Sequence, residues 1–272
     1  MSIRAVLFDL DNTLIFEDES AYAAVRGAAA IAHQRARVDA AALADAVVAT
    51  AEAVWRASPV FTYGELFGVW WAEALWGEMS GETEAARAMR AFAPEFRGSV
   101  WRGGLQRIGV VDQALAGELE QAYIRIRRSG EKLDPDAEVV LAGLASGQRL
   151  ALVSNGAGDV QREKLGRTPF GRYLSPIVIS MEVGFGKPDP RIFQNALEIL
   201  GVDAEDAVMV GDSLARDVAG AHAAGIRAVW IDRGGAGESS DAKPDARIER
   251  LSDLPAALDA LARRPASPPA SP

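Results

Sequence analysis

The sequence predicts an α/β fold in which an all-helical block interrupts a parallel β-sheet. From about residue 134 onward, short apolar segments alternate with helical segments, which is typical of a parallel sheet covered on both faces. The apolar segment at residues 3–9 reads as a strand that needs partners, and the later strands can supply them. Between them, residues 20–128 are rich in Ala, Leu, Glu and Arg, with apolar residues three and four apart, which favours helices.

The expected elements follow in chain order. In the inserted block, helices are expected at about 20–36, 39–57, 62–78, 82–92 and 112–128, with breaks at Ser58-Pro59, Gly77, Pro94 and Gly103-Gly104. In the remainder, strands are expected at 149–153, 176–179, 207–210 and 226–231, and helices at 136–146, 158–166, 189–200 and 214–224. The expected domains are an α/β core of residues 1–15 and 133–262, a helical domain of residues 16–132, and a disordered Pro/Ser/Ala-rich tail of residues 263–272.

Composition excludes several classes of protein. Acidic residues outnumber basic ones 38 to 29, which argues against binding to nucleic acid. Cysteine is absent, and two histidines are too few for a His-rich zinc site. No apolar run reaches the roughly 18 residues of a membrane span, and Asp9 and Asp11 interrupt the first apolar stretch where a signal peptide would be. We therefore expect a cytoplasmic enzyme or binding protein, without a membrane or nucleic-acid partner, as a monomer or homodimer.

Polar side chains follow the predicted strands at the edge where ligands bind in an open parallel sheet. They are Asp9, Asp11 and Thr13 after the first strand, Ser154 and Asn155 after the second, Lys187 in the loop after the third, and Asp212 and Asp217 after the fourth. Each alone could be an ordinary turn residue. Their convergence at one edge predicts a single site.

The residue types at this edge fit phosphoryl transfer. The Asp9 carboxylate could attack phosphorus to form a covalent intermediate, and Asp11 could then serve as acid and base if the chain bends after the strand. Ser154 and Asn155 offer hydrogen-bond donors to phosphoryl oxygens, and Lys187 offers a positive charge. Surface or turn roles remain the competing interpretation of each residue.

Asp212 and Asp217 are candidate ligands of magnesium. Carboxylates are hard oxygen ligands, and neither His nor Cys is near them in the sequence. A bound cation would offset the repulsion between these carboxylates and a phosphate, so the net charge of −9 does not exclude an anionic substrate. Thr13 is interpreted either as a local hydrogen-bonding brace or as an ordinary turn residue.

Together these residues resemble the four motifs of the haloacid dehalogenase (HAD) superfamily. The matching segments are Asp9-x-Asp11-x-Thr13, Ser154-Asn155, Lys187-Pro188 and Gly211-Asp212-Ser213 with Asp217 beyond. The resemblance implies a Rossmann-like core with an inserted C1-type helical cap. It also implies a Mg²⁺-dependent phosphatase that forms an aspartyl-phosphate. Finally, it implies a metal site made of Asp9, the backbone carbonyl of Asp11, and Asp212, with Asp217 acting through water.

Several activities share this scaffold. Dehalogenation is disfavoured, because the dehalogenases that resemble this family lack a second Asp in the first motif, where this chain has Asp11. A phosphomutase remains an alternative, and a non-catalytic phospholigand-binding protein is a weaker one because no motif residue is missing. Asn12 makes the first motif more similar to the nucleotidase and sialic-acid-phosphate phosphatase branches. The expected partner is a small phosphorylated metabolite, such as a nucleotide or a sugar phosphate.

Other conspicuous residues are given structural roles. His33 and His222 fall within predicted helices and are interpreted as structural. Five of the six tryptophans lie in or beside the helical block and are expected in its core, with a pocket or dimer role left open for one or two. Gly103-Gly104 could be either a hinge or a turn.

Overall fold

The computed structural model describes residues 2–234 and 240–263, and the chain folds into two compact units. The first comprises the residues up to Phe16, Leu133–Ser154 and the residues from Thr168 onward; the second comprises Glu17–Lys132 and Asn155–Arg167. The segment Asn155–Arg167, expected with the α/β core, thus belongs to the second unit. The tail predicted at residues 263–272 lies outside the described residues, apart from Arg263.

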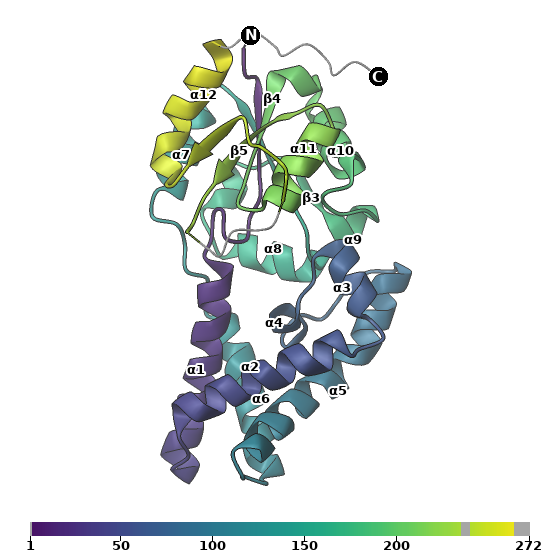
Figure 1. Cartoon of the computed structure of the whole chain (residues 1–272), viewed down its shortest axis with the longest axis vertical. Coiled ribbons are helices and arrows are strands. Elements are labelled where there is room, and N and C mark those ends of the chain that lie inside the picture. Colours follow the sequence, from purple (N-terminus) through teal and green to yellow (C-terminus); the bar gives the residue numbers. More distant parts are fainter. Residues whose placement is uncertain (1, 235–239, 264–272) are drawn as a thin grey trace. The chain divides into compact units, whose positions relative to one another are not determined.

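The first unit contains a six-stranded sheet whose paired strands are all parallel, in the order β3-β2-β1-β4-β5-β6 (Figure 1). Its strands are β1 (Ala5–Phe8), β2 (Arg149–Ser154), β3 (Ile177–Ile179), β4 (Ala207–Gly211), β5 (Arg227–Ile231) and β6 (Ala246–Ile248). β1 pairs with both β2 and β4, so the N-terminal strand does find its partners in the later part of the chain. The predicted fold class is confirmed. The edge strand β6 was not predicted, because its three residues include only one that is buried.

Successive residues of a strand point to opposite faces of the sheet, and both kinds are buried here, so both faces of the sheet are covered. On one face, residues such as Leu7, Val153 and Met209 pack against α10 (Pro190–Leu200) and α11 (Ala219–Ala223). α7 (Ala137–Leu144) and α12 (Leu254–Arg263) lie together on the other side in Figure 1. α12 was not predicted, although leucines at 254, 258 and 261 have helical spacing. A short helix, α9 (Ser180–Val183), follows β3.

The second unit is helical throughout. It contains α1 (Glu17–Ala36), α2 (Ala40–Arg56), α3 (Phe61–Phe67), α4 (Trp71–Ala74), α5 (Glu84–Arg107), α6 (Gln113–Arg127) and α8 (Gly158–Gly166). Side chains of Asp39, Thr83 and Asp112 cap α2, α5 and α6 by accepting backbone N–H bonds. Of the tryptophans, those at 55, 71, 76 and 101 are buried, as expected for a core, and Trp70 is half-buried. In the part of the chain that the structure describes, no helix is both long and apolar enough to cross a membrane.

Two expected helix boundaries are wrong. The helix predicted at 62–78 is divided at Gly68, whose φ of 73° ends α3 in the left-handed conformation. α5 continues to Arg107, through Pro94 and the Gly103-Gly104 pair, where breaks were expected. The glycines serve packing instead: a Cβ on Gly103 would lie 2.8 Å from Thr50 Cγ2 of α2, and one on Gly104 would lie 2.5 Å from Val47 Cγ2. The pair therefore forms neither a hinge nor a turn.

Replacing a tightly packed and an unhindered helical glycine with alanine should have opposite effects on stability. Gly104→Ala is expected to lower the free energy of unfolding by about 1–3 kcal/mol, because the added methyl group would overlap Val47. Gly117→Ala is the matched control on α6, where a Cβ meets nothing within 4 Å. It should raise stability by about 0.5–1 kcal/mol through helix propensity. Urea denaturation of both variants measures the difference, and a stabilised Gly104→Ala protein would contradict the packing role.

Candidate active site

The chain leaves strand geometry directly after β1. The carbonyl of Leu10 accepts backbone N–H bonds from Thr13 (3.3 Å), Leu14 (2.9 Å) and Ile15 (3.1 Å), which closes a tight turn around Asn12. Asn12 has a φ of 57°, a left-handed conformation that asparagine adopts more readily than most residues. This turn is the bend that two functional carboxylates, Asp9 and Asp11, require if they are to serve one site.

Three carboxylates meet at the carboxyl ends of two neighbouring strands. Asp9 follows β1, Asp212 follows β4, and one oxygen from each, with one from Asp217, lies within 4.8 Å of the others. The main-chain carbonyl of Asp212 accepts a 2.7 Å hydrogen bond from Trp230 Nε1 of β5. Three close carboxylate oxygens are the donor set that a hard divalent cation prefers. These residues therefore fit a Mg²⁺ site.

Lys187 joins two of these carboxylates from within the protein. Its Nζ donates to Oδ1 of Asp9 at 2.5 Å and to Oδ1 of Asp217 at 2.7 Å, and all three side chains are buried. Burial raises the pKa of Asp9 to about 7, opposed by Lys187 and reinforced by Asp217 and Asp11. Burial alone would lower the pKa of Lys187, but the carboxylates of Asp217 and Asp9 raise it above its ordinary value. The lysine is thus held as a cation among acids.

Asp217 is fixed by the turn that precedes it. Its Oδ2 accepts the backbone N–H of Ser213 at 3.0 Å, while its Oδ1 is bound to Lys187. The segment Leu214–Val218 is a single π-helical turn, an irregularity that is frequent at functional sites. A Cβ on Gly211 would lie 2.2 Å from the Asp217 carboxyl carbon. Glycine is therefore required at 211, a role that the sequence analysis did not assign although the residue lies within the matched motif.

The remaining expected residues are placed as follows. Asp11 is half-buried in the turn after β1, and Ser154 is the fully buried last residue of β2. Asn155, also buried, begins the segment that belongs to the second unit. Thr13 is buried, and its hydroxyl has no hydrogen-bond partner among the described residues. The brace expected of the Thr13 side chain is therefore not seen.

Arg233, which the sequence analysis missed, holds the turn instead. It follows β5, and its guanidinium donates to the main-chain carbonyls of Asn12 (3.2 Å) and Thr13 (2.7 Å). It also pairs with Asp134 at 2.7 Å and lies 4.9 Å from the ring centre of Phe16. A single side chain thereby ties the first-motif turn to both chain segments that border the helical insertion. Its position two residues after a predicted strand was the available signal.

Neither histidine contributes to the carboxylate cluster. His33 Nδ1 lies 2.8 Å from the carbonyl oxygen of Val38, and His222 Nε2 lies 2.9 Å from Asp245. Both contacts are structural, as the sequence suggested.

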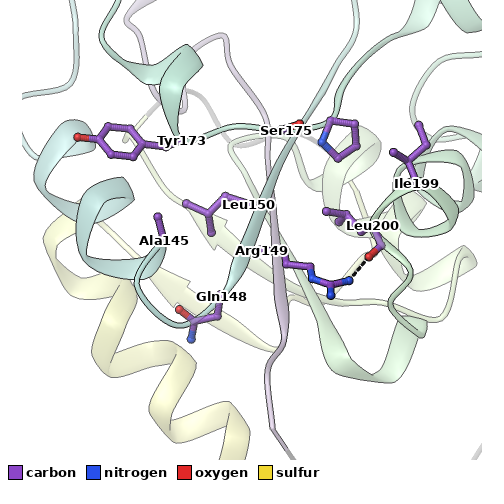
Figure 2. Close-up of a pocket in the computed structure, with 9 residues that line it drawn as sticks. Ala145, Gln148, Arg149, Leu150, Tyr173, Ser175, Ile199 and Leu200 are labelled. Carbon is purple, nitrogen blue, oxygen red and sulfur yellow. Dashed lines mark hydrogen bonds between the residues drawn. The ribbon is translucent and has the colours of Figure 1, made fainter.

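A separate cleft of about 430 Å³ lies at the amino-terminal ends of β2 and β3, whereas the carboxylates lie at the carboxyl ends of strands (Figure 2). It is lined by residues that precede or begin β2 and β3 and by the end of α10, among them Leu150, Ser175 and Ile199. The charged residue in its lining is Arg149, whose guanidinium donates to the carbonyl of Leu200 (Figure 2). With no acidic residue in that lining, the cleft is chemically unlike the carboxylate cluster.

Known proteins resemble this chain over nearly its whole length. The family model of haloacid dehalogenase-like hydrolases matches residues 3–225. Phosphoserine phosphatase of Thermus thermophilus is 39% identical, covering 93% of this chain and 98% of that protein. N-acylneuraminate-9-phosphatase of Rattus norvegicus is 29% identical, covering 95% of each chain.

Solved structures agree on the fold. YfnB of Bacillus subtilis, solved with magnesium bound, has a TM-score of 0.65 at 22% identity, covering 95% of this chain and all of its own. A 2-haloacid dehalogenase from Pseudomonas syringae has a TM-score of 0.57 at 27% identity, covering 95% of this chain and 99% of its own.

The chain belongs to the haloacid dehalogenase-like hydrolases. Within that family it stands with the phosphoric monoester hydrolases, because the two curated relatives described above, which match over nearly their full length, are phosphatases.

Because Gly211 lies so close to Asp217, adding a single methyl group at residue 211 should strongly reduce catalytic activity. Gly211→Ala is expected to reduce kcat/KM about 100-fold, because the added Cβ must displace the Asp217 carboxylate and with it Lys187. Gly143→Ala, in α7 where a Cβ meets nothing within 4 Å, is the matched control and should leave activity unchanged. Steady-state kinetics on both variants tests this, and full activity in Gly211→Ala would show that the carboxylate tolerates displacement.

Proposed function

We propose that the protein is a Mg²⁺-dependent phosphatase that hydrolyses a small-molecule phosphomonoester through an aspartyl-phosphate. The observation that carries this proposal is the buried Asp9 carboxyl, bound to Lys187 at 2.5 Å and within 4.8 Å of acids that fit a cation. A carboxylate so placed is a nucleophile for phosphorus with counter-charges on more than one side.

Asp9 and Asp11 divide the chemistry between them. In the first step, an oxygen of Asp9 bonds to phosphorus and the ester bond breaks, while Asp11 gives a proton to the departing alkoxide. In the second step, water attacks the phosphorus of the aspartyl-phosphate, and Asp11 takes a proton from that water. Inorganic phosphate leaves, and the Asp9 carboxylate and the Asp11 acid are both restored.

Ser154, Asn155 and Lys187 are the proposed phosphate ligands. The buried hydroxyl of Ser154 and the backbone N–H groups of the turn after β2 offer donors, and the Lys187 ammonium offers charge. Because Lys187 already pairs with Asp9, it can hold the nucleophile and a phosphoryl oxygen in one arrangement.

The proposed metal ligands are Asp9, the backbone carbonyl of Asp11, and Asp212. The proximity of the carboxylates supports this set, and the two engaged oxygens of Asp217 support an indirect role for that residue. Bound Mg²⁺ would offset the negative charge of the acids and of the transferring phosphoryl group.

Two rival activities are less well supported. Dehalogenases among the structural relatives share the fold, but Asp11, which the resembling dehalogenases lack, favours phosphoryl transfer. A phosphomutase would use the same residues and would return the phosphoryl group to an organic acceptor instead of to water. Release of inorganic phosphate without an added acceptor discriminates between them.

The substrate is to be sought among phosphorylated metabolites. Phosphoserine comes first, because the relative at 39% identity is a phosphoserine phosphatase, and N-acylneuraminate 9-phosphate, other sugar phosphates and nucleotides follow. Comparison of kcat/KM over this panel, with magnesium present, identifies the preferred class.

The raised pKa of Asp9 predicts how stability depends on pH without metal. The folded protein holds a proton on Asp9 up to about pH 7, whereas the unfolded chain releases it near 3.8. The stability associated with that proton is therefore present at low pH and lost as the pH rises through this window. Asp9→Asn lacks this titration, so its stability relative to wild type should increase by about 2–3 kcal/mol between pH 5 and pH 8.

Urea denaturation in a chelator at the two pH values measures this difference. Magnesium should offset this loss of stability in the wild type, with a larger gain at pH 8 than at pH 5, because the metal binds the ionised carboxylate. A wild-type gain from magnesium that is equal at both pH values, or that Asp9→Asn retains, would remove Asp9 from the metal site.

Substitution of the two first-motif acids separates the two steps of the reaction. Asp9→Asn should abolish turnover with every substrate, because no carboxylate remains to attack. Asp11→Asn should still transfer the phosphoryl group of an aryl phosphate, whose phenolate leaves without a proton, but hydrolyse the aspartyl-phosphate slowly. Stopped-flow kinetics should show a burst of about one phenolate per site, followed by slow turnover.

With an alkyl phosphate, the burst of Asp11→Asn should vanish, because that leaving group needs the acid. Asp45→Asn, an exposed change on α2, is the control and should behave as wild type. Equal loss of burst and turnover with both substrates would count against Asp11 as acid and base, and turnover in Asp9→Asn would overturn the nucleophile.

A further inference from the structure

A second set of buried charges lies in the helical unit, and the proposed mechanism uses none of it. Glu17, Glu73, Arg127 and Lys164 are at most 2% exposed, and the side chain of Glu131 is fully buried. Arg127 Nη2 binds both oxygens of Glu17 at 2.8 and 2.7 Å, and Lys164 Nζ lies 3.3 Å from Glu17 and 2.8 Å from Glu73. Removing charged groups from water costs free energy, so we looked for a function of this arrangement.

One branch of this set reaches the turn after β2. Oε1 of Glu73, in α4, accepts hydrogen bonds from Lys164 Nζ at 2.8 Å and from Gln161 Nε2 at 2.9 Å. Gln161 Nε2 also lies 3.2 Å from the main-chain carbonyl of Asn155, to which it donates. The fully buried Gln161 amide therefore links a carboxylate of the helical insertion to the backbone next to Ser154.

The turn itself is shaped to receive Gln161. Gly156 has a φ of 143°, a region that L side chains rarely adopt, and a Cβ there would lie 2.3 Å from Gln161 Nε2. Glycine at 156 thus permits both the backbone conformation and the close approach of the amide. This observation is independent of the ion pairs and involves the same side chain.

We propose that Glu73 and Gln161 are positioning residues for the phosphate-binding turn Ser154–Gly156. Glu73 orients the Gln161 amide, and Gln161 fixes the Asn155 carbonyl, which sets the direction of the adjacent donors. The inference rests on the proposed phosphatase function for its kinetic consequence, but the ordering of the turn by Gln161 does not. In this arrangement, a residue of the helical insertion contributes to phosphate binding without touching the phosphate.

Gln161→Met tests the proposal, because methionine keeps the volume of the side chain and removes its hydrogen bonds. Backbone amide exchange at residues 155–157, measured by mass spectrometry without ligand, should accelerate at least about tenfold. With substrate and magnesium, KM and the inhibition constant for inorganic phosphate should each rise about fivefold to tenfold, while kcat changes less than about twofold. Gln161→Asn, which stays polar but is too short to reach both partners, should show the same effects if Gln161→Met does not fold.

Glu131→Gln is the matched control, because Glu131 belongs to the same buried set but pairs with Arg127, away from the turn. Its melting temperature can fall, yet exchange at 155–157, KM and phosphate inhibition should equal those of wild type. Unchanged exchange in the Gln161 variants, or the same kinetic change in Glu131→Gln, would overturn the proposal. A wild-type protein that hydrolyses no phosphomonoester would refute the phosphatase function, and the exchange result would still decide the role of Gln161.

Discussion

The contact between Lys187 and two buried carboxylates is the constraint on which the site depends. Asp9 and Asp217 are both nearly inaccessible to water, and two such acids so close together would repel each other strongly without a cation between them. The lysine meets one oxygen of each, at 2.5 and 2.7 Å, and is itself 3% exposed. One positive charge among three acids leaves the cluster negative, which is the electrostatic condition for attracting a divalent cation.

The pairing of the strands and the turns that follow them bring these charged residues together. The pairing of Phe8 with Val210 aligns β1 with β4, so that the acids after the two strands emerge side by side. The π-helical turn after Ser213 and the missing side chain at Gly211 then allow Asp217 to fold back over the strand end. Arg233 completes the support from β5 by binding the carbonyls of the first turn. The ends of β1, β4 and β5 thus supply either a charge or a group that holds one in place.

The sequence predicts the parts of this protein that local patterns control. Apolar strands separated by helices predicted the parallel sheet, and the acids after the first and fourth predicted strands predicted the carboxylate cluster. Residues whose role depends on a distant neighbour were missed. Gly103 and Gly104 resemble helix breakers until α2 is placed against them, and Arg233 resembles any loop arginine until the carbonyls of Asn12 and Thr13 face it. The link from Glu73 to Gln161 joins residues 88 positions apart, which no local pattern encodes.

The backbone conformation at Asn12 gives a physical reason for a residue type that the family resemblance linked to the substrate. The sequence alone suggested that Asn12 makes the first motif more similar to the nucleotidase and sialic-acid-phosphate phosphatase branches. The structure places this residue at a φ of 57°, in the left-handed region that Gly and Asn adopt more readily than most residues. The turn has to reverse the chain within three residues so that Leu10 can accept its three backbone N–H bonds. Glycine and asparagine both satisfy that requirement, so a backbone role accounts for the residue type at position 12 without any contact with a substrate.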